Sequence, residues 1–404
     1  MALQSGIAAG LVPSLRPHNL VLPTLLAAGV LGVLAAGFVT VAPNRLLSGR
    51  PVGLFAAADG RLSAAITIIA AFLLLTALAP PARAMQRTAA LLAAGLFLLV
   101  LAASGEAAAS LAAGAPTLAR ISLGAGFWIL LGTAALTLVD ALQRAGAGTA
   151  VRFGVIAALA VAVAAMAHAG LFESLSLARE YKTRHDLFGA ALLRHVVLVA
   201  AAVAPAVLIG FPLGVAAVRH PRVQEPLFAV LNLLQTIPSI ALFGLLIVPL
   251  SALANAVPAV AALGIGGIGP APAIIALILY ALLPIVRNSV AGISGVDRAV
   301  IDAARGMGMT RQQLFWRVEL PLALPLLLAG LRIVTVQAVG LAVVAALIGA
   351  GGLGTFVFEG LGQYAADLVF LGALPAILLA LAADFLLQML SALASPRPMI
   401  EIAK

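Results

Sequence analysis

The sequence predicts an all-α protein that crosses a membrane many times, and three observations support this class. Of its 404 residues, 63% are apolar and 9% are charged, whereas an ordinary soluble domain has about 25% charged residues. The apolar residues form runs of about 20, the length with which a helix crosses a hydrocarbon core of about 30 Å. These runs do not alternate apolar with polar residues, which disfavours a barrel, and lipid cannot satisfy the edges of an open sheet. We therefore expect helices and no sheet.

About ten transmembrane helices are expected, at residues 20–42, 62–79, 88–104, 121–140, 153–172, 195–218, 227–250, 272–293, 322–349 and 366–394. The last spans are long enough to tilt or bend, and Pro325 and Pro375 are the places where they could do so. Residues 251–271 are apolar but rich in glycine and proline. This segment predicts a short helix and a loop at the membrane surface.

The longest polar interruption divides these spans into two blocks. Its mixed charges and spaced leucines, in residues 173–194, favour a helix at the membrane interface, either as a plain linker or as a docking element. We expect an N-terminal block of about five helices at residues 1–172 and a second block at residues 195–404.

The formal net charge of +9 comes from basic residues scattered between apolar runs, a pattern typical of membrane topology and not of nucleic-acid binding. If residues 296–321 are cytoplasmic, ten spans place both termini in the cytoplasm. Fourteen of the 23 basic residues then lie inside, eight lie outside, and Arg332 lies within a span. The run at residues 20–42 follows Arg16 and is too long for the core of a signal peptide, so we expect a retained anchor.

The chain contains no cysteine, which excludes disulfides, thiol nucleophiles and cysteine-ligated metals. Its two lysines, Lys182 and Lys404, do not follow a G-x-x-x-x-G pattern, so no phosphate-binding P-loop is expected. Any nucleotide must therefore be bound by another subunit. His168 and His195 stand at the ends of predicted spans, where an interfacial histidine is favoured over a metal ligand.

The polar loop at residues 296–321 predicts a helix, a glycine elbow and a second helix. Gly306 or Gly308 can take the left-handed conformation that ends a helix, and Thr310 and Gln313 have the spacing of a capping box. We expect the second helix to end at Leu320 and Pro321, where the next span begins. The loop also carries apolar side chains, including methionines and aromatics, which suit either a groove on a soluble partner or packing against the loop itself.

This loop resembles the EAA loop of ABC-importer permeases, which reads EAA, three residues, G, nine residues and I-x-L-P. The matching positions are Asp302, Ala303, Ala304, Gly308, Val318, Leu320 and Pro321, with Asp in place of Glu and Val in place of Ile. The segments Asn232 to Leu246, Pro272 to Ile293 and Ala346 to Leu361 resemble the osmoprotectant branch of these permeases. The likeness covers about residues 186–395, and the extension before it resembles that of long members of the YehY type.

The resemblance implies a five-helix type I (MetI-like) permease core in residues 195–404 and a place in the bacterial inner membrane. It implies import of glycine betaine, choline or carnitine, with two ATPase subunits that bind ATP and Mg²⁺, a second permease copy or a shorter paralogue, and an extracytoplasmic binding protein. No cofactor is expected in this chain. The coupling residues implied are Asp302, Ala303, Ala304, Gly308, Met309, Phe315, Val318, Leu320 and Pro321.

Polar residues inside spans are the candidates for a translocation path, because they tend to face a bundle interior. They are Asn232, Gln235, Thr236, Asn288 and Gln337. Each could instead make an interhelical hydrogen bond worth about 1 kcal/mol or less. Pro238 and Pro284 could break helices and free backbone carbonyls toward a cavity.

Three other functions are weighed against this interpretation. A permease for another small solute, such as an amino acid, would share the same loop. A proton-coupled transporter would need an acid in the membrane, for which Asp140 and Asp384 are the candidates, the latter being also a conceivable ion-pair partner of Arg332. A membrane enzyme would need a cluster of His, Asp or Glu on one face, and the sequence shows none.

Overall fold

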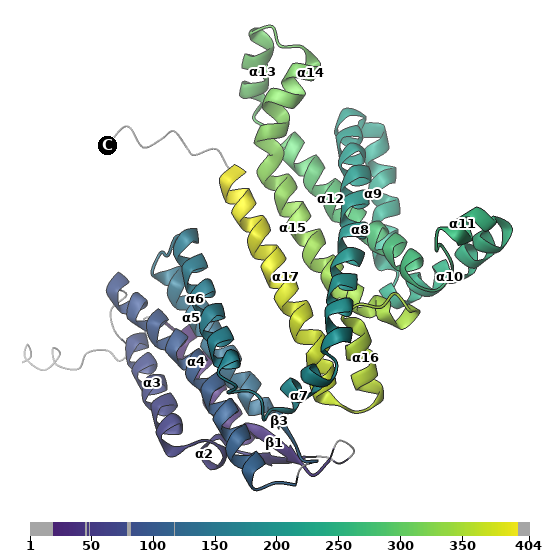
Figure 1. Ribbon diagram of the computed structural model, residues 1–404. Helices are drawn as coiled ribbons and strands as arrows, with labels where there is room; N and C mark the ends of the chain where they lie inside the picture. The colour runs from purple at the N-terminus through teal and green to yellow at the C-terminus, as the bar shows by residue number, and fades with distance from the viewer. Residues whose placement is uncertain (1–18, 45–46, 48, 79–81, 117, 395–404) are drawn as a thin grey trace, which may run out of the picture. The chain divides into compact units, whose positions relative to one another are not determined.

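The computed structural model describes residues 19–44, 47, 49–78, 82–116 and 118–394 and divides into two compact units, Met1–Lys182 and Thr183–Lys404 (Figure 1). Nine helices in this described part are long and apolar enough to cross a membrane. The predicted all-α polytopic class is thereby confirmed. The predicted cytoplasmic termini, with Arg16, lie outside the described residues and stay a prediction.

The first unit contains the helices α1 (Val21–Ala35), α2 (Leu54–Ala57), α3 (Gly60–Leu78), α4 (Arg83–Ala113), α5 (Ala125–Arg144), α6 (Thr149–His168) and α7 (Ser176–Thr183). Helix α4 packs against α3 and α5, and α5 also packs against α1. The core between them includes the fully buried Leu73, Leu96 and Phe127. Helix α1 has 15 residues and so rises only about 22 Å, less than the hydrocarbon thickness of about 30 Å.

A three-stranded antiparallel sheet contradicts the expectation that the chain forms no sheet. Its strands, in the order β2-β1-β3, are β2 (Arg50–Val52), β1 (Val39–Ala42) and β3 (Arg120–Leu123). The predicted spans 20–42 and 121–140 are therefore part helix and part strand. The prediction failed because it treated every apolar run as lipid-exposed, whereas the central strand here has its backbone paired on both sides.

The polar segment 173–194 is not one interfacial helix. Its first part contains α7, where Glu180 is buried and lies 3.2 Å from the guanidinium of Arg120 in β3. Its second part belongs to α8 (His185–Arg219), a helix of 35 residues that lies within the second unit. The helix breaks between Thr183 and His185, so the two halves of the predicted linker pack in different units.

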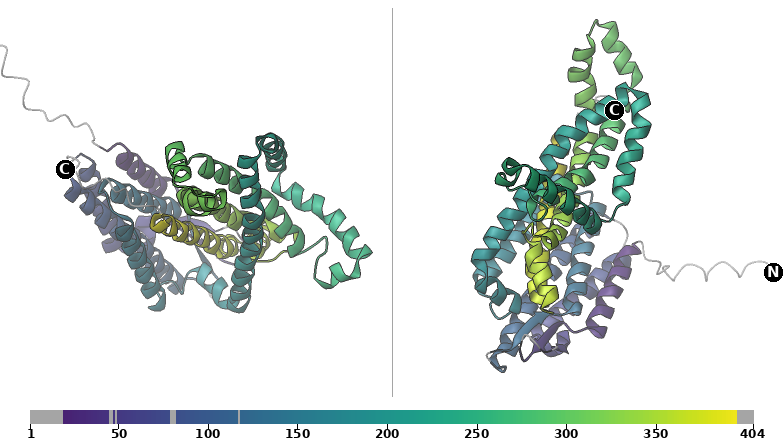
Figure 2. Two further views of the ribbon diagram at one scale, coloured as in Figure 1. Left: turned by 90° about the horizontal axis from the view of Figure 1, so that it is seen from above. Right: turned by 90° about the vertical axis from the view of Figure 1, so that its right-hand side faces the viewer.

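After α8, the second unit contains α9 (Pro221–Thr236), α10 (Ser239–Ala256), α11 (Pro258–Ala262), α12 (Pro270–Ser294), α13 (Arg298–Gly306), α14 (Arg311–Leu314), η1 (Phe315–Glu319), α15 (Leu320–Val344), η2 (Ala345–Ile348), α16 (Gly354–Gly362) and α17 (Ala366–Ala394). Helix α12 is central, because it packs against α8 and α15, and α15 also packs against α17. The hairpin of α13 and α14 stands beyond the ends of α8 and α9, as Figure 1 and the right view of Figure 2 show.

The predicted span 227–250 is wrong, because the helix breaks before Pro238. Helix α9 ends at Thr236, and α10 begins after Pro238, whose ring cannot continue a helix through Ile237. Pro284 differs, since it lies inside the continuous helix α12 and does not break it. The carbonyl that Pro284 leaves without an intrahelical donor is that of Tyr280, four residues earlier, and it accepts a hydrogen bond from Nε2 of Gln235 at 2.6 Å.

Close packing between α8 and α12 depends on Gly214. A Cβ atom at this position would lie 2.4 Å from Cβ of Ser289 and 3.2 Å from the carbonyl oxygen of Val286, a backbone atom that a rotamer change cannot move. We expect Gly214→Ala to lower stability by about 1–3 kcal/mol through overpacking, seen as a lower melting temperature in detergent. Gly189→Ala is the matched control, because it lies in the same helix and its Cβ would meet no atom within 4 Å. Equal melting temperatures for the two variants would contradict this account.

Candidate functional site

The loop between α12 and α15 begins with a capped helix. Asp297 is the N-cap of α13, and its Oδ1 accepts a hydrogen bond from the backbone N–H of Ala299 at 2.9 Å. A carboxylate at this position satisfies a free N–H group and favours the helix dipole. Asp302 then lies on the exposed face of α13 and meets Arg305 at 3.5 Å. Of the two alanines of the motif, Ala304 is buried and Ala303 is exposed.

The glycine elbow is a Schellman motif centred on Gly308. This residue has φ +80°, its N–H donates to the carbonyl of Arg305 at 2.9 Å, and the N–H of Met309 donates to the carbonyl of Ala304 at 3.3 Å. These two bonds end a helix and turn the chain sharply at the left-handed residue. The prediction that a glycine forms the elbow is confirmed, and it is Gly308, because Gly306 remains within α13.

The second helix starts with the predicted capping box. Oγ1 of Thr310 accepts from the N–H of Gln313 at 3.3 Å, while Oε1 of Gln313 accepts from the N–H of Thr310 at 2.9 Å. Two N–H groups that would otherwise be unpaired are satisfied reciprocally. With the helix ends fixed on both sides of Gly308, the elbow has a defined geometry.

The predicted end of the second helix at Leu320 and Pro321 is wrong. Helix α14 continues through the π-helical turn η1 into α15, so the chain is helical from Arg311 to Ile348. Pro321 has no N–H and its ring would collide with the carbonyl four residues earlier in an α-helix. The chain avoids this by widening the turn, with the N–H of Leu320 donating to the carbonyl of Phe315.

The base of the loop is held to the body of the second unit by an ion pair whose carboxylate is buried. Glu319 is 3% exposed and accepts from Nη2 of Arg219, the last residue of α8. The guanidinium of Arg219 also lies over the ring of Phe315, 5.9 Å from its centroid. The ion pair between Arg219 and Glu319 joins residues 100 positions apart in the sequence. The hairpin and α8 are therefore expected to move together.

The apolar side chains of the hairpin divide between packing and exposure. Leu314 is buried, and Met309, Phe315, Val318 and Leu320 are partly covered, so these side chains pack on the hairpin's own base. Met307 and Trp316 remain 72% and 58% exposed. The alternative of packing against the loop itself is thus confirmed for Leu314. The exposed Met307 and Trp316 leave an apolar surface on the hairpin, and its use by a soluble partner stays a prediction.

Four of the candidate path residues lie together where α9 breaks. The Nε2 group of Gln235 donates to the carbonyl of Tyr280 at 2.6 Å, and Oδ1 of Asn232 accepts from Arg287 at 3.3 Å. Thr236 is exposed, its hydroxyl bonded within its own helix, and Pro238 caps α10. Tyr280, which the sequence analysis did not select, donates its hydroxyl to the carbonyl of Ile237 and so holds the break against α12.

The other two candidates do not join this group. Asn288 lies on α12 against α15, at a point where a Cβ on Gly330 would come within 2.7 Å of the asparagine Cβ. Its side chain bonds to Pro284 of its own helix. Gln337 lies on α15 and is partly exposed. Asn288 therefore has a packing role, and it is set apart from the helix break.

The sequence did not indicate that His195 is a core residue. It was expected at a membrane interface, but it is fully buried within α8, with Nε2 3.1 Å from the carbonyl oxygen of Val339 in α15. The neighbouring Arg194 donates from Nε to the carbonyl of Ala350 at 3.1 Å, in the turn that follows η2. The misplacement followed from starting the span at residue 195, whereas α8 begins ten residues earlier.

Both acids that a proton-coupled transporter could use are paired. Asp384 in α17 forms a two-pronged ion pair with Arg332 in α15, with Nη2 to Oδ2 at 2.7 Å. Asp140 meets Arg144 at 2.9 Å and accepts from Asn19 at 2.8 Å. These contacts give each carboxylate a structural partner.

The pairing predicts how Asp384→Asn behaves. Because Arg332 loses its charged partner between two apolar helices, we expect a loss of about 3 kcal/mol in stability and a lower yield of folded protein. Transport per folded molecule should be retained. The measurement is solute uptake normalised to the amount of folded protein in the membrane. Asp140→Asn, which removes the charge of the other candidate acid, is measured in the same way. Complete loss of uptake by well-folded Asp384→Asn would instead favour proton coupling.

Comparison with known proteins decides the family. Residues 206–395 match the binding-protein-dependent transport system inner membrane component, and residues 17–178 match the N-terminal domain of the ABC transporter permease YehY. The carnitine transport permease OpuCB of Listeria monocytogenes is 38% identical over 208 residues, which are 52% of this chain and 88% of that protein. The chain belongs to the binding-protein-dependent permeases of ABC importers.

Two further matches accompany this assignment. The osmoprotectant import permease OsmW of Salmonella typhimurium is 41% identical to the permease over 50% of this chain and 90% of OsmW. A solved structure of the inward-facing MetNI methionine ABC transporter covers 53% of the permease and 99% of that chain, at 22% identity and a TM-score of 0.46. The permease is a transport protein, and the hairpin at Gly308 lies within the matched residues 206–395.

Proposed function

We propose that the chain is the permease subunit of an ATP-driven importer of osmoprotectants such as glycine betaine, choline or carnitine. The observation that carries the proposal is its 34% to 41% identity to permeases that are named for these solutes or for osmoprotectant import. The hairpin α13–α14 supports it physically, because a rigid, capped elbow with exposed Met307 suits a groove on a soluble ATPase.

The complex proposed around this chain has several members. Two ATPase subunits bind ATP and Mg²⁺ and receive the hairpins, while this chain itself holds no cofactor. A second permease, either an identical copy or a shorter paralogue, completes the path, and an extracytoplasmic binding protein delivers the solute. The whole complex lies in the bacterial inner membrane, with both termini of this chain in the cytoplasm.

The translocation path is proposed to run past the break between α9 and α10. Here Asn232, Gln235 and Thr236 gather beside Pro238, in a helix pair that also exposes apolar side chains such as Leu233 and Ile240. Polar groups and broken helices at membrane depth are typical of solute pathways. Asn288 and Gln337 were also candidates, and the contacts of Asn288 favour packing over solute binding. Selection among quaternary ammonium solutes is assigned to the binding protein.

Uptake measurements in cells test this proposal. A bacterial strain lacking osmoprotectant uptake is given this chain with a cognate ATPase and binding protein, and uptake of labelled glycine betaine, choline and carnitine is measured. We expect uptake that stops when either partner is omitted. Uptake of an amino acid such as methionine or histidine alone would favour the other importer class. Uptake that persists without any ATPase and collapses with a protonophore would favour a proton-coupled transporter.

A further inference from the structure

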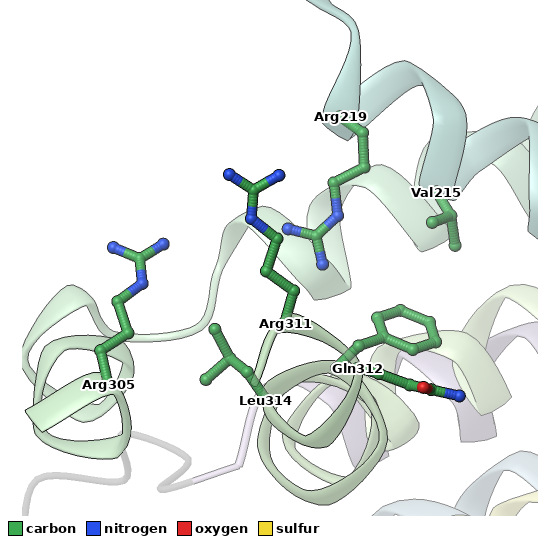
Figure 3. Close-up of a pocket in the computed structure, with 7 residues that line it drawn as sticks. Val215, Arg219, Arg305, Arg311, Gln312 and Leu314 are labelled. Atoms are coloured by element: carbon green, nitrogen blue, oxygen red, sulfur yellow. The ribbon is translucent and has the colours of Figure 1, made fainter. Parts of the chain in front are cut away.

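A cavity of about 410 Å³ lies where the end of α8 meets the hairpin. Figure 3 shows the arginines around it, Arg219 at the end of α8 and Arg305 and Arg311 on the two helices of the hairpin. Val215, Leu314 and Phe315 form its apolar wall, and Gln312 completes the lining. The cavity therefore combines three guanidinium groups with a hydrocarbon surface.

The charges around this cavity are not balanced. Arg219 is paired with the buried Glu319, and Arg305 meets the exposed Asp302 at 3.5 Å. The guanidinium of Arg311 forms no hydrogen bond or ion pair with any part of the chain that the structure describes. One arginine thus remains uncompensated, and a second has only a weak, solvent-exposed partner. A negatively charged ligand would complete the cluster.

The position of the cavity indicates where that ligand comes from. Helix α8 is apolar along most of its 35 residues and ends at Arg219, and Val215 stands one turn before that end. The cavity therefore lies at the level where a membrane-crossing helix leaves the hydrocarbon for the headgroup layer. Basic pockets between helices at this level suit anionic lipid headgroups, and the planar guanidinium fork matches phosphate oxygens.

We propose that this cavity binds the headgroup of an anionic phospholipid such as phosphatidylglycerol. The phosphate lies among Arg219, Arg305 and Arg311, and an acyl chain follows the apolar wall at Val215 and Phe315. Because the bound lipid would touch α8 and both helices of the hairpin, it would tie the hairpin to the membrane surface. This inference does not depend on the identity of the transported solute or on ATPase docking.

Trp316 provides a reporter for this proposal. It is 58% exposed, and its ring centroid lies 5.3 Å from that of Phe315 in the cavity wall. The chain has two tryptophans, so Trp128→Phe leaves Trp316 as the sole fluorophore. The protein is reconstituted into phosphatidylcholine vesicles that contain a minor fraction of either brominated phosphatidylglycerol or brominated phosphatidylcholine. We expect stronger quenching of Trp316 by the brominated phosphatidylglycerol.

Arginine variants connect the quenching to the cavity. Arg305→Gln and Arg311→Gln should each weaken the preference for phosphatidylglycerol about fivefold, the effect of removing one arginine from a headgroup site. Arg298→Gln is the matched control, because it lies exposed on the same hairpin and does not line the cavity. Arg219 is kept, since it also pairs with Glu319. Equal quenching by both brominated lipids, or equal effects of all three variants, would overturn the proposal.

Two other ligands are separated by further measurements. In detergent, short-chain phosphatidylglycerol should raise the melting temperature of the protein, whereas inorganic phosphate at the same concentration should not. An equal shift with phosphate would make the cavity a free-anion site and overturn the lipid assignment. If Arg305→Gln and Arg311→Gln abolish binding of the ATPase while the lipid preference is unchanged, the cavity receives an acidic group of the protein partner, and the proposal again fails.

Discussion

Gly308→Asp is expected to leave the permease in the membrane while abolishing its association with the ATPase. Gly308 has φ +80°, a conformation that aspartate tolerates better than most residues, and a Cβ atom there would meet nothing within 4 Å. The fold should therefore survive. A carboxylate at the tip of the elbow would be desolvated without a partner in the proposed groove, costing about 2 kcal/mol or more, or about thirtyfold in affinity. Co-purification with the ATPase and stimulation of its ATP hydrolysis measure the effect.

A pair of alanine variants separates backbone geometry from surface chemistry at the elbow. Neither Gly306→Ala nor Gly308→Ala places a Cβ near another atom, but only position 308 is left-handed. Gly308→Ala should cost about 1–2 kcal/mol in strain and weaken coupling, whereas Gly306→Ala should be neutral or slightly stabilising. If Gly308→Asp co-purifies with a fully stimulated ATPase, the hairpin is not the coupling element. If both alanine variants behave alike, the left-handed conformation at position 308 is not what coupling requires.

Breaking the ion pair at the base of the hairpin is expected to give the second large effect, with a marked asymmetry. Arg219→Gln leaves Glu319, which is 3% exposed, without a counter-charge. Because the arginine itself is partly exposed, we expect a loss of about 3 kcal/mol, the lower end of the range for buried pairs. Glu319→Gln leaves Arg219, whose side chain is 42% exposed and can turn toward water. Glu319→Gln should therefore lower the free energy of unfolding by only about 1 kcal/mol. Thermal unfolding of the purified protein in detergent measures both.

The double variant completes this test. Arg219→Leu combined with Glu319→Leu removes both charges, so it should be more stable than Arg219→Gln alone, since apolar replacements of buried pairs are often close to neutral. A double variant as unstable as Arg219→Gln would show that the side chains act separately. Equal stability of the two single variants would contradict the assigned burial of Glu319.

The hairpin could be predicted from the sequence because its signals are local. Asp297, Gly308 and the pair Thr310 and Gln313 fix helix ends through bonds to backbone groups within a few residues. The break at Pro238 was available as a possibility for the same reason. Such features follow from residue type and spacing alone.

The features that the sequence analysis missed depend on tertiary contacts. The continuation of α14 into α15 depends on a widened turn at Phe315–Glu319, and a proline at position 321 equally suits the start of a new helix. The sheet in the first unit pairs segments that are remote in the sequence, β1 with β3. Burial of His195 and the ion pair of Glu319 with Arg219 likewise join distant positions. Hydropathy reports none of these pairings.

The uninterrupted helix from Arg311 to Ile348 has a mechanical consequence. Its 38 residues make a rod of about 57 Å, with the capped elbow at one end and the glycine-rich turn at Gly349 at the other. A tilt of about 5° at the elbow displaces the far tip by about 5 Å, since a rod of this length amplifies small rotations. A small rotation of the elbow on one side of the bilayer thus displaces the far end of the helix, on the other side, by about the size of a small solute.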